Sequence, residues 1–123
     1  GVALTSSVEA MTARFNRYLE GRDTLAGFAY FCLTVIESTA SGRSAAARQF
    51  GIALRVLDRL ARLASEHGGA DARKASGLPR DYTHAERSWL EAAVKAMILR
   101  TAEVAFDPPV ERPQITMASL PDL

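Results

Sequence analysis

Thirteen consecutive residues, Thr24 to Ile36, carry no charge. Within this run the apolar residues recur at helical spacing and leave almost no polar side; they are Leu25, Phe28, Phe31, Cys32, Val35 and Ile36. A helix that is apolar all round needs neighbours on every side, whereas a membrane span needs about 18 or more such residues. The run therefore predicts a buried central helix, capped by Asp23 and extending to about Glu37, in a protein that does not enter a membrane.

Two capping boxes, in which a Ser or Thr is followed three residues later by Glu, mark the starts of two more helices. Ser6–Glu9 precedes a helix that ends at Gly21, and Thr83–Glu86 precedes one that ends before Pro108. The buried face of this last helix is predicted to contain Trp89, Leu90, Ala93, Val94, Met97 and Val104.

Two further helices are expected in the stretch SAAARQFGIALRVLDRL, Ser44 to Leu60. Ser44 is the expected cap of a short helix that ends at Phe50, and a second helix spans about residues 53–67. Gly51 between them tolerates the positive φ of a tight turn, and Ala47 allows the two helices to cross closely. The apolar residues that would hold this corner are Ala46, Phe50, Ile52, Leu57 and Leu60.

Across these 17 residues the corner resembles the helix-turn-helix family. The resemblance implies that the helix 53–67 is a recognition helix, which would enter the major groove of DNA by its N-terminal end. The alternative is a structural corner, because any two packed helices that meet at a glycine need the same residues.

The net charge of the whole chain is only +1, but residues 42–74 contain seven basic and three acidic side chains. The four candidate nucleic-acid-binding residues lie in this part: Arg43, Arg48, Arg55 and Arg59. Among the first residues of the second helix, only Arg55 has donors that distinguish guanine. Arg43, Arg48 and Arg59 would hold phosphates. Asp58 falls on the same exposed stripe and weakens the DNA hypothesis.

The spacing from Arg62 to His67 resembles the motif of HEPN domains, helical bundles of which many are ribonucleases. This resemblance implies that His67 transfers protons and that Arg62 stabilises a phosphoryl oxyanion. Leu63 stands where that family usually has a polar residue, and the alternative for His67 is a solvated residue near a helix C-terminus.

Motifs for other chemistry are missing from the sequence. Two histidines and one cysteine give no paired ligand spacing, and no phosphate-binding glycine loop or nucleophile elbow is present. We therefore expect no catalytic residue, no metal site and no cofactor. The single Cys32 excludes an internal disulfide and favours a reduced, cytoplasmic location, and no secretory signal pattern stands at the N-terminus.

The chain is expected to form one all-α domain, a compact five-helix bundle over residues 1–107, followed by an extended tail over residues 108–123. Four prolines in the tail prevent a long helix, and its spaced apolar residues predict that it docks on the domain or on a partner. These residues are Ile115, Met117, Leu120 and Leu123.

The segments FAYFCLTVIES, WLEAAVKAMILR and PQITMASLPDL are similar to a group of short uncharacterised bacterial proteins. The leading hypothesis is a non-catalytic helical module of a bacterial cell that binds a macromolecule or a second copy of itself. DNA binding is the first alternative, and a HEPN-like ribonuclease is the second. The expected partner is a protein or a homo-oligomer, and neither a membrane nor a small-molecule cofactor is expected.

Overall fold

The computed structural model describes residues 2–68, 82–107 and 111–123. This part of the chain contains five α-helices: α1 (Val2–Leu19), α2 (Leu25–Ala40), α3 (Arg43–Phe50), α4 (Leu54–Gly68) and α6 (His84–Phe106). A 3-10 turn, η1 (Met117–Ser119), lies near the C-terminus. The prediction of a compact all-α bundle is confirmed.

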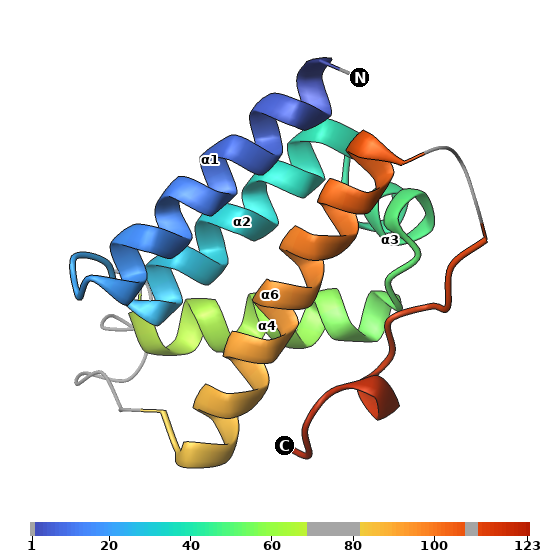
Figure 1. Cartoon of the computed structure of the whole chain (residues 1–123). Coiled ribbons are helices and arrows are strands. Elements are labelled where there is room, and N and C mark those ends of the chain that lie inside the picture. The colour runs from blue at the N-terminus through green and yellow to red at the C-terminus, as the bar shows by residue number, and fades with distance from the viewer. Residues whose placement is uncertain (1, 69–81, 108–110) are drawn as a thin grey trace.

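Helix α2 lies at the centre of the bundle, as its uncharged run predicts. It contacts α1, α3, α4 and α6, and Phe28, Cys32 and Ile36 on it are almost completely buried. Helices α1 and α2 lie side by side, and α4 crosses α6 (Figure 1). The apolar side chains of α2 therefore find neighbours in four other helices.

The cap of α2 is Thr24 and not Asp23, so that prediction is wrong. The Oγ1 atom of Thr24 accepts a hydrogen bond from the Gly27 backbone N–H at 2.9 Å. Asp23 instead accepts a hydrogen bond from Arg14 Nε at 2.7 Å, which connects the end of α1 to the start of α2. A long-range ion pair thus replaces the local cap.

The other predicted caps have different outcomes. The box Thr83–Glu86 is confirmed, with both of its reciprocal hydrogen bonds present. The cap at Ser6 is wrong because α1 begins four residues earlier, where Leu4 packs against the core. The cap at Ser44 is wrong as well, because Gly42 takes the capping position and Ser44 lies inside α3.

The corner between α3 and α4 has the predicted turn. Gly51 has a φ of 64° and ends α3, with its N–H bonded to the Ala47 carbonyl. A Cβ atom at this position would lie 2.8 Å from Nη1 of Arg100, so both backbone conformation and space favour glycine. The five predicted corner residues are all buried: Ala46, Phe50, Ile52, Leu57 and Leu60.

Burial also makes the thiol of Cys32 unreactive. Desolvation raises its pKa from 9.0 to about 12, so the thiol's contribution to stability is complete below pH 9 and is lost as the pH rises towards 12. We expect the native protein not to react with a thiol reagent at pH 8, and the urea-unfolded protein to react at once. Rapid labelling of the native protein would contradict this burial.

Candidate interaction surfaces

Two carboxylates hold Arg43, the first of the four candidate nucleic-acid-binding arginines. Its Nε donates to Oε2 of Glu37 at 2.7 Å, and its Nη1 donates to Oδ1 of Asp58 at 3.1 Å. The hydrogen bond to Glu37 is the main cause of the raised pKa of Arg43. The guanidinium thus connects α2, α3 and α4, and its charge is largely compensated inside the protein.

The other three candidate arginines differ from Arg43 in the described part of the chain. Arg48 and Arg55 are exposed and Arg59 is half-buried, and none of the three has a hydrogen bond or ion pair in the described part of the chain. The first residue of α4, however, is Leu54, which is 42% exposed. With Asp58 one turn further on, the outer stripe of α4 combines basic, acidic and apolar side chains.

The C-terminal segment docks on the turn of this corner (Figure 1). The Ile115 N–H donates to the Gly51 carbonyl at 2.9 Å, and the Ala53 N–H donates to the Ile115 carbonyl at 2.8 Å. These two bonds form an isolated parallel bridge, and the side chains of Ile115, Met117 and Leu120 pack against the core. The tail therefore lies against the N-terminal end of α4, the end that a recognition helix would insert into DNA.

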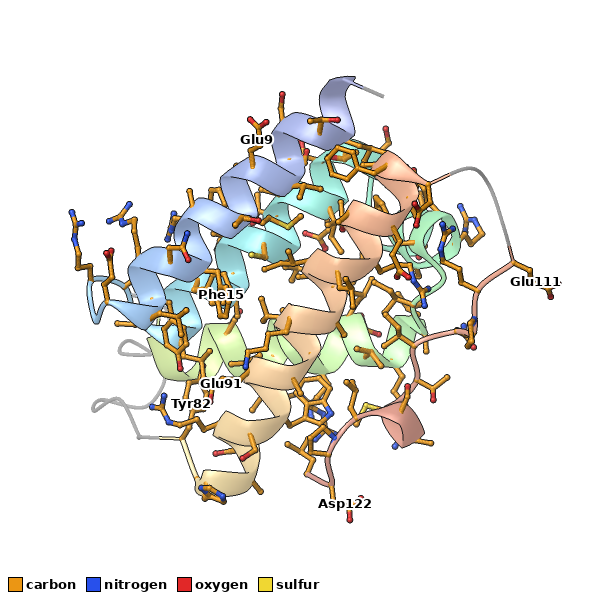
Figure 2. All side chains as sticks on the ribbon, viewed as in Figure 1. Glu9, Phe15, Tyr82, Glu91, Glu111 and Asp122 are labelled. Carbon is orange, nitrogen blue, oxygen red and sulfur yellow. The ribbon has the colours of Figure 1, made fainter. Side chains whose placement is uncertain are left out.

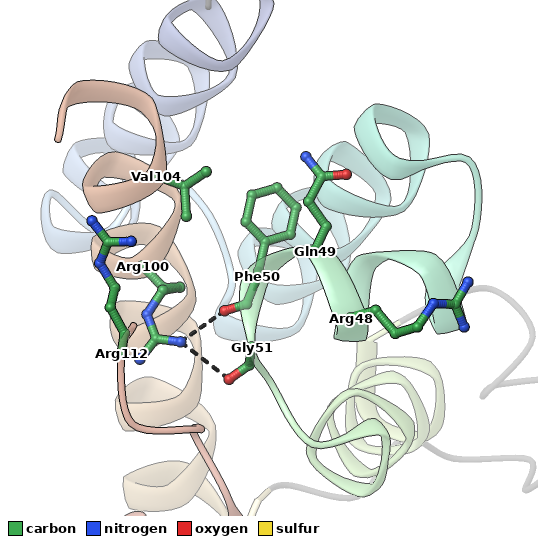
Figure 3. A pocket seen from close by; sticks show the side chains of 7 residues that line it. All are labelled: Arg48, Gln49, Phe50, Gly51, Arg100, Val104 and Arg112. Atoms are coloured by element: carbon green, nitrogen blue, oxygen red, sulfur yellow. Dashed lines mark hydrogen bonds between the residues drawn. The ribbon is translucent and has the colours of Figure 1, made fainter. Parts of the chain in front are cut away.

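Arg100 on α6 joins the tail to the corner. Its Nη1 donates to the carbonyls of Phe50 at 2.7 Å and Gly51 at 3.1 Å (Figure 3). Its Nη2 donates to the carbonyl of Pro113 at 2.7 Å. The residue is only 8% exposed. A guanidinium has five donors in one plane, so it satisfies carbonyls from α3, the turn and the tail together.

A cavity of about 160 Å³ lies beside Arg100. The arginine side chains that line this cavity do not point to a common centre, because the guanidinium of Arg48 points away from that of Arg100 (Figure 3). Arg112 also lines the cavity and donates to the Glu103 carbonyl at 3.2 Å. Arg100 and Arg112 already have oxygen partners, so this region attaches the tail and is a poor anion site.

Helix α6 carries a second apolar face, which the sequence analysis missed. Its inner face is buried against the bundle, whereas Leu99 and Phe106 are each 63% exposed. Ala92, Lys95 and Ala102 complete the same outward stripe, with alternating spacings of three and four residues. This spacing is typical of helices that pair, and could have revealed the face from the sequence. We call these five residues the α6 outer face.

An apolar groove adjoins the α6 outer face. The groove lies between α1 and α6, has a volume of about 240 Å³, and is lined by Val8, Thr12, Phe15, Lys95, Ile98, Leu99 and Ala102. The Lys95 ammonium lies 5.8 Å from the centre of the Phe15 ring at one end of it. Phe15 sits on the lower half of α1 and Glu9 projects outward further up the helix (Figure 2). The groove enlarges the apolar surface on this side of the molecule.

Known proteins give no guide to these surfaces. No protein-family model, curated protein or solved structure matches the chain. The resemblances to helix-turn-helix proteins, to HEPN domains and to short bacterial proteins stay predictions.

Arg62 and His67 are the two residues that the HEPN resemblance names as catalytic. Arg62 is exposed on α4, and the side chain of His67 lies outside the described part of the structure. No group of three or more His, Cys, Asp or Glu side chains that could hold a metal occurs within residues 2–68, 82–107 and 111–123.

Among the helices described, none has the length and apolarity to span a bilayer.

Proposed function

We propose that this chain is a non-catalytic helical module that associates with another protein surface through the α6 outer face. The observation that carries the proposal is the exposure of Leu99 and Phe106, seven residues apart on one side of a helix whose opposite side is buried. Soluble monomers rarely expose large contiguous apolar patches, and such patches mark interaction sites. The adjoining groove supports the same function.

The energetic argument concerns what these two side chains do for the isolated chain. Full burial of a Leu or Phe side chain contributes about 1.5–3 kcal/mol, and most of this is unused while the side chain is exposed. Leu99 and Phe106 therefore add little to the free energy of folding, but their burial in an interface would stabilise a complex. The proposed setting is the cytoplasm of a bacterial cell, which the single unpaired thiol of Cys32 supports.

Site-specific photo-cross-linking in the cell tests this function. A benzophenone amino acid replaces Leu99, and a matched variant carries it in place of Arg62, an exposed residue on α4. We expect a covalent protein adduct from position 99 and none from position 62. If position 99 gives no more adduct than position 62, the α6 outer face is not an interaction site.

DNA binding is the second candidate, favoured by the exposed side chains of Arg48 and Arg55 beside the turn at Gly51. This candidate predicts binding to duplex DNA at low salt. Arg55→Ala would weaken it, and loss of one phosphate contact in Arg48→Ala would reduce the salt slope by about 1. A fluorescence anisotropy titration measures both effects. Absence of binding at low salt, or equal binding by Arg55→Ala, would remove this candidate.

A further inference from the structure

The α6 outer face is complementary to an inverted copy of itself. In an antiparallel pair of α6 helices centred on Leu99, a residue k positions before 99 lies beside the residue k positions after 99 in the other copy. Ala92 then lies beside Phe106, and Lys95 lies beside Glu103. Leu99 lies beside Leu99 of the second copy.

Side-chain size fits this arrangement. Phe106 is large and 63% exposed, and the residue that would receive it, Ala92, is one of the two alanines of the α6 outer face. Alternation of large and small residues across a helix pair allows the two surfaces to interdigitate. The same match occurs twice, once at each end of the pair, because the arrangement is symmetric.

Charge fits it as well. Lys95 is exposed and forms no ion pair within the described residues. Glu103 has ion pairs with Arg100 at 3.3 Å and with Arg112 at 4.0 Å, but 38% of its side chain stays exposed beside the α6 outer face. A parallel pair would instead place Lys95 beside Lys95 and Phe106 beside Phe106. Opposite charges across an interface favour the antiparallel orientation and like charges oppose the parallel one.

We infer that a second copy of this chain occupies the α6 outer face, with the two α6 helices antiparallel and a two-fold axis passing at Leu99. The inference rests on the proposed function and names the partner. An interface of this kind uses the same patch on both copies and closes after two of them. The assembly is therefore a dimer that does not grow into larger oligomers.

Disulfide trapping with the full chain tests this geometry. Two cysteines form a bridge only when their Cα atoms lie within about 7 Å, a condition that position 99 meets across the axis. In Lys95→Cys the two copies of position 95 are separated by eight residues of helix, about 12 Å along the axis. Under mild oxidation we expect Leu99→Cys to form covalent dimer about tenfold faster than Lys95→Cys. The buried Cys32 gives no background reaction.

A mixed experiment checks the direction of the two helices. Ala92→Cys and Phe106→Cys should each give little covalent dimer alone, because two copies of either position lie about 21 Å apart along the pair. A mixture of the two variants should give a covalent heterodimer. Circular dichroism confirms that each variant is folded before it is oxidised.

The outcomes separate this inference from the function on which it rests. Two results would show that a second copy does not occupy the face but would leave the interaction module standing. One is an equal rate of disulfide formation in Leu99→Cys and Lys95→Cys. The other is no disulfide at position 99, combined with a photo-cross-link from position 99 to a different protein. No photo-adduct from position 99 would overturn both.

Discussion

Replacement of Arg100 by methionine is expected to lower the free energy of unfolding by about 3–5 kcal/mol. The guanidinium is the donor for the carbonyls of Phe50, Gly51 and Pro113, and the residue is only 8% exposed. Methionine keeps much of the length and volume but donates nothing, so these carbonyls lose a charged partner. Urea denaturation followed by circular dichroism measures the loss.

Two controls show whether the loss comes from these hydrogen bonds. Arg100→Lys keeps the positive charge, but a compact ammonium does not reproduce the planar set of donors, so most of the loss should remain. Arg62→Met removes an exposed arginine from α4 and should change stability by about 0.5 kcal/mol or less. A loss below about 1 kcal/mol in Arg100→Met would show that the tail and the corner are stable without this bridge.

Trp89→Ala is expected to be similarly damaging, with a loss of about 3–5 kcal/mol in the free energy of unfolding. Trp89 on α6 is completely buried and is among the largest side chains of the core. Its removal leaves a cavity that the surrounding helices fill only in part. Thermal unfolding of the variant should show a correspondingly lower midpoint than that of the parent protein.

Trp89→Phe tests how much of this loss comes from the size of the cavity. Within the described part of the structure, the buried indole Nε1 has no hydrogen-bond partner. Phenylalanine leaves a smaller cavity and removes this N–H, whose burial costs about 1–3 kcal/mol when it is unpaired. We therefore expect Trp89→Phe to lose much less stability than Trp89→Ala. Both replacements remove the N–H, so the difference between them measures the larger cavity that alanine leaves, and equal losses would contradict the close packing around this ring.

The sequence predicts those parts of the fold that depend on local signals. The uncharged run around Cys32 needs neighbours on all sides, and α2 has them. Thr83 and Glu86 are three residues apart and form their box without help from other elements. Gly51 is the residue with the conformational freedom that the turn requires.

Hydrogen bonds and ion pairs between residues far apart in the sequence cannot be predicted from such local signals. Asp23 looks like a helix cap in the sequence, but the position of Arg14 on α1 decides its partner. Arg100 and Phe50 are 50 residues apart, and nothing near either residue indicates their hydrogen bond. The same applies to Arg43, whose two carboxylate partners come from α2 and α4.

The α6 outer face was missed for a different reason. Helix α6 has apolar residues on two sides, and the sequence analysis predicts only one of them, the buried face that contains Trp89 and Met97. Trp89 and Met97 turn out to be buried, whereas Leu99 and Phe106 remain outside. The proposed function depends on the exposure of these two apolar side chains, Leu99 and Phe106.

Sedimentation equilibrium of the purified full chain tests the association of two copies most directly, with Leu99→Glu and Arg62→Glu as matched variants. A carboxylate on the two-fold axis would meet its own copy in the dimer, whereas a carboxylate at position 62 lies on α4. We predict a concentration-dependent mass that approaches twice that of one chain for the parent protein and Arg62→Glu, and the mass of one chain for Leu99→Glu. A parent protein that stays monomeric at the highest concentrations, or a dimer that Leu99→Glu leaves intact, would contradict the account.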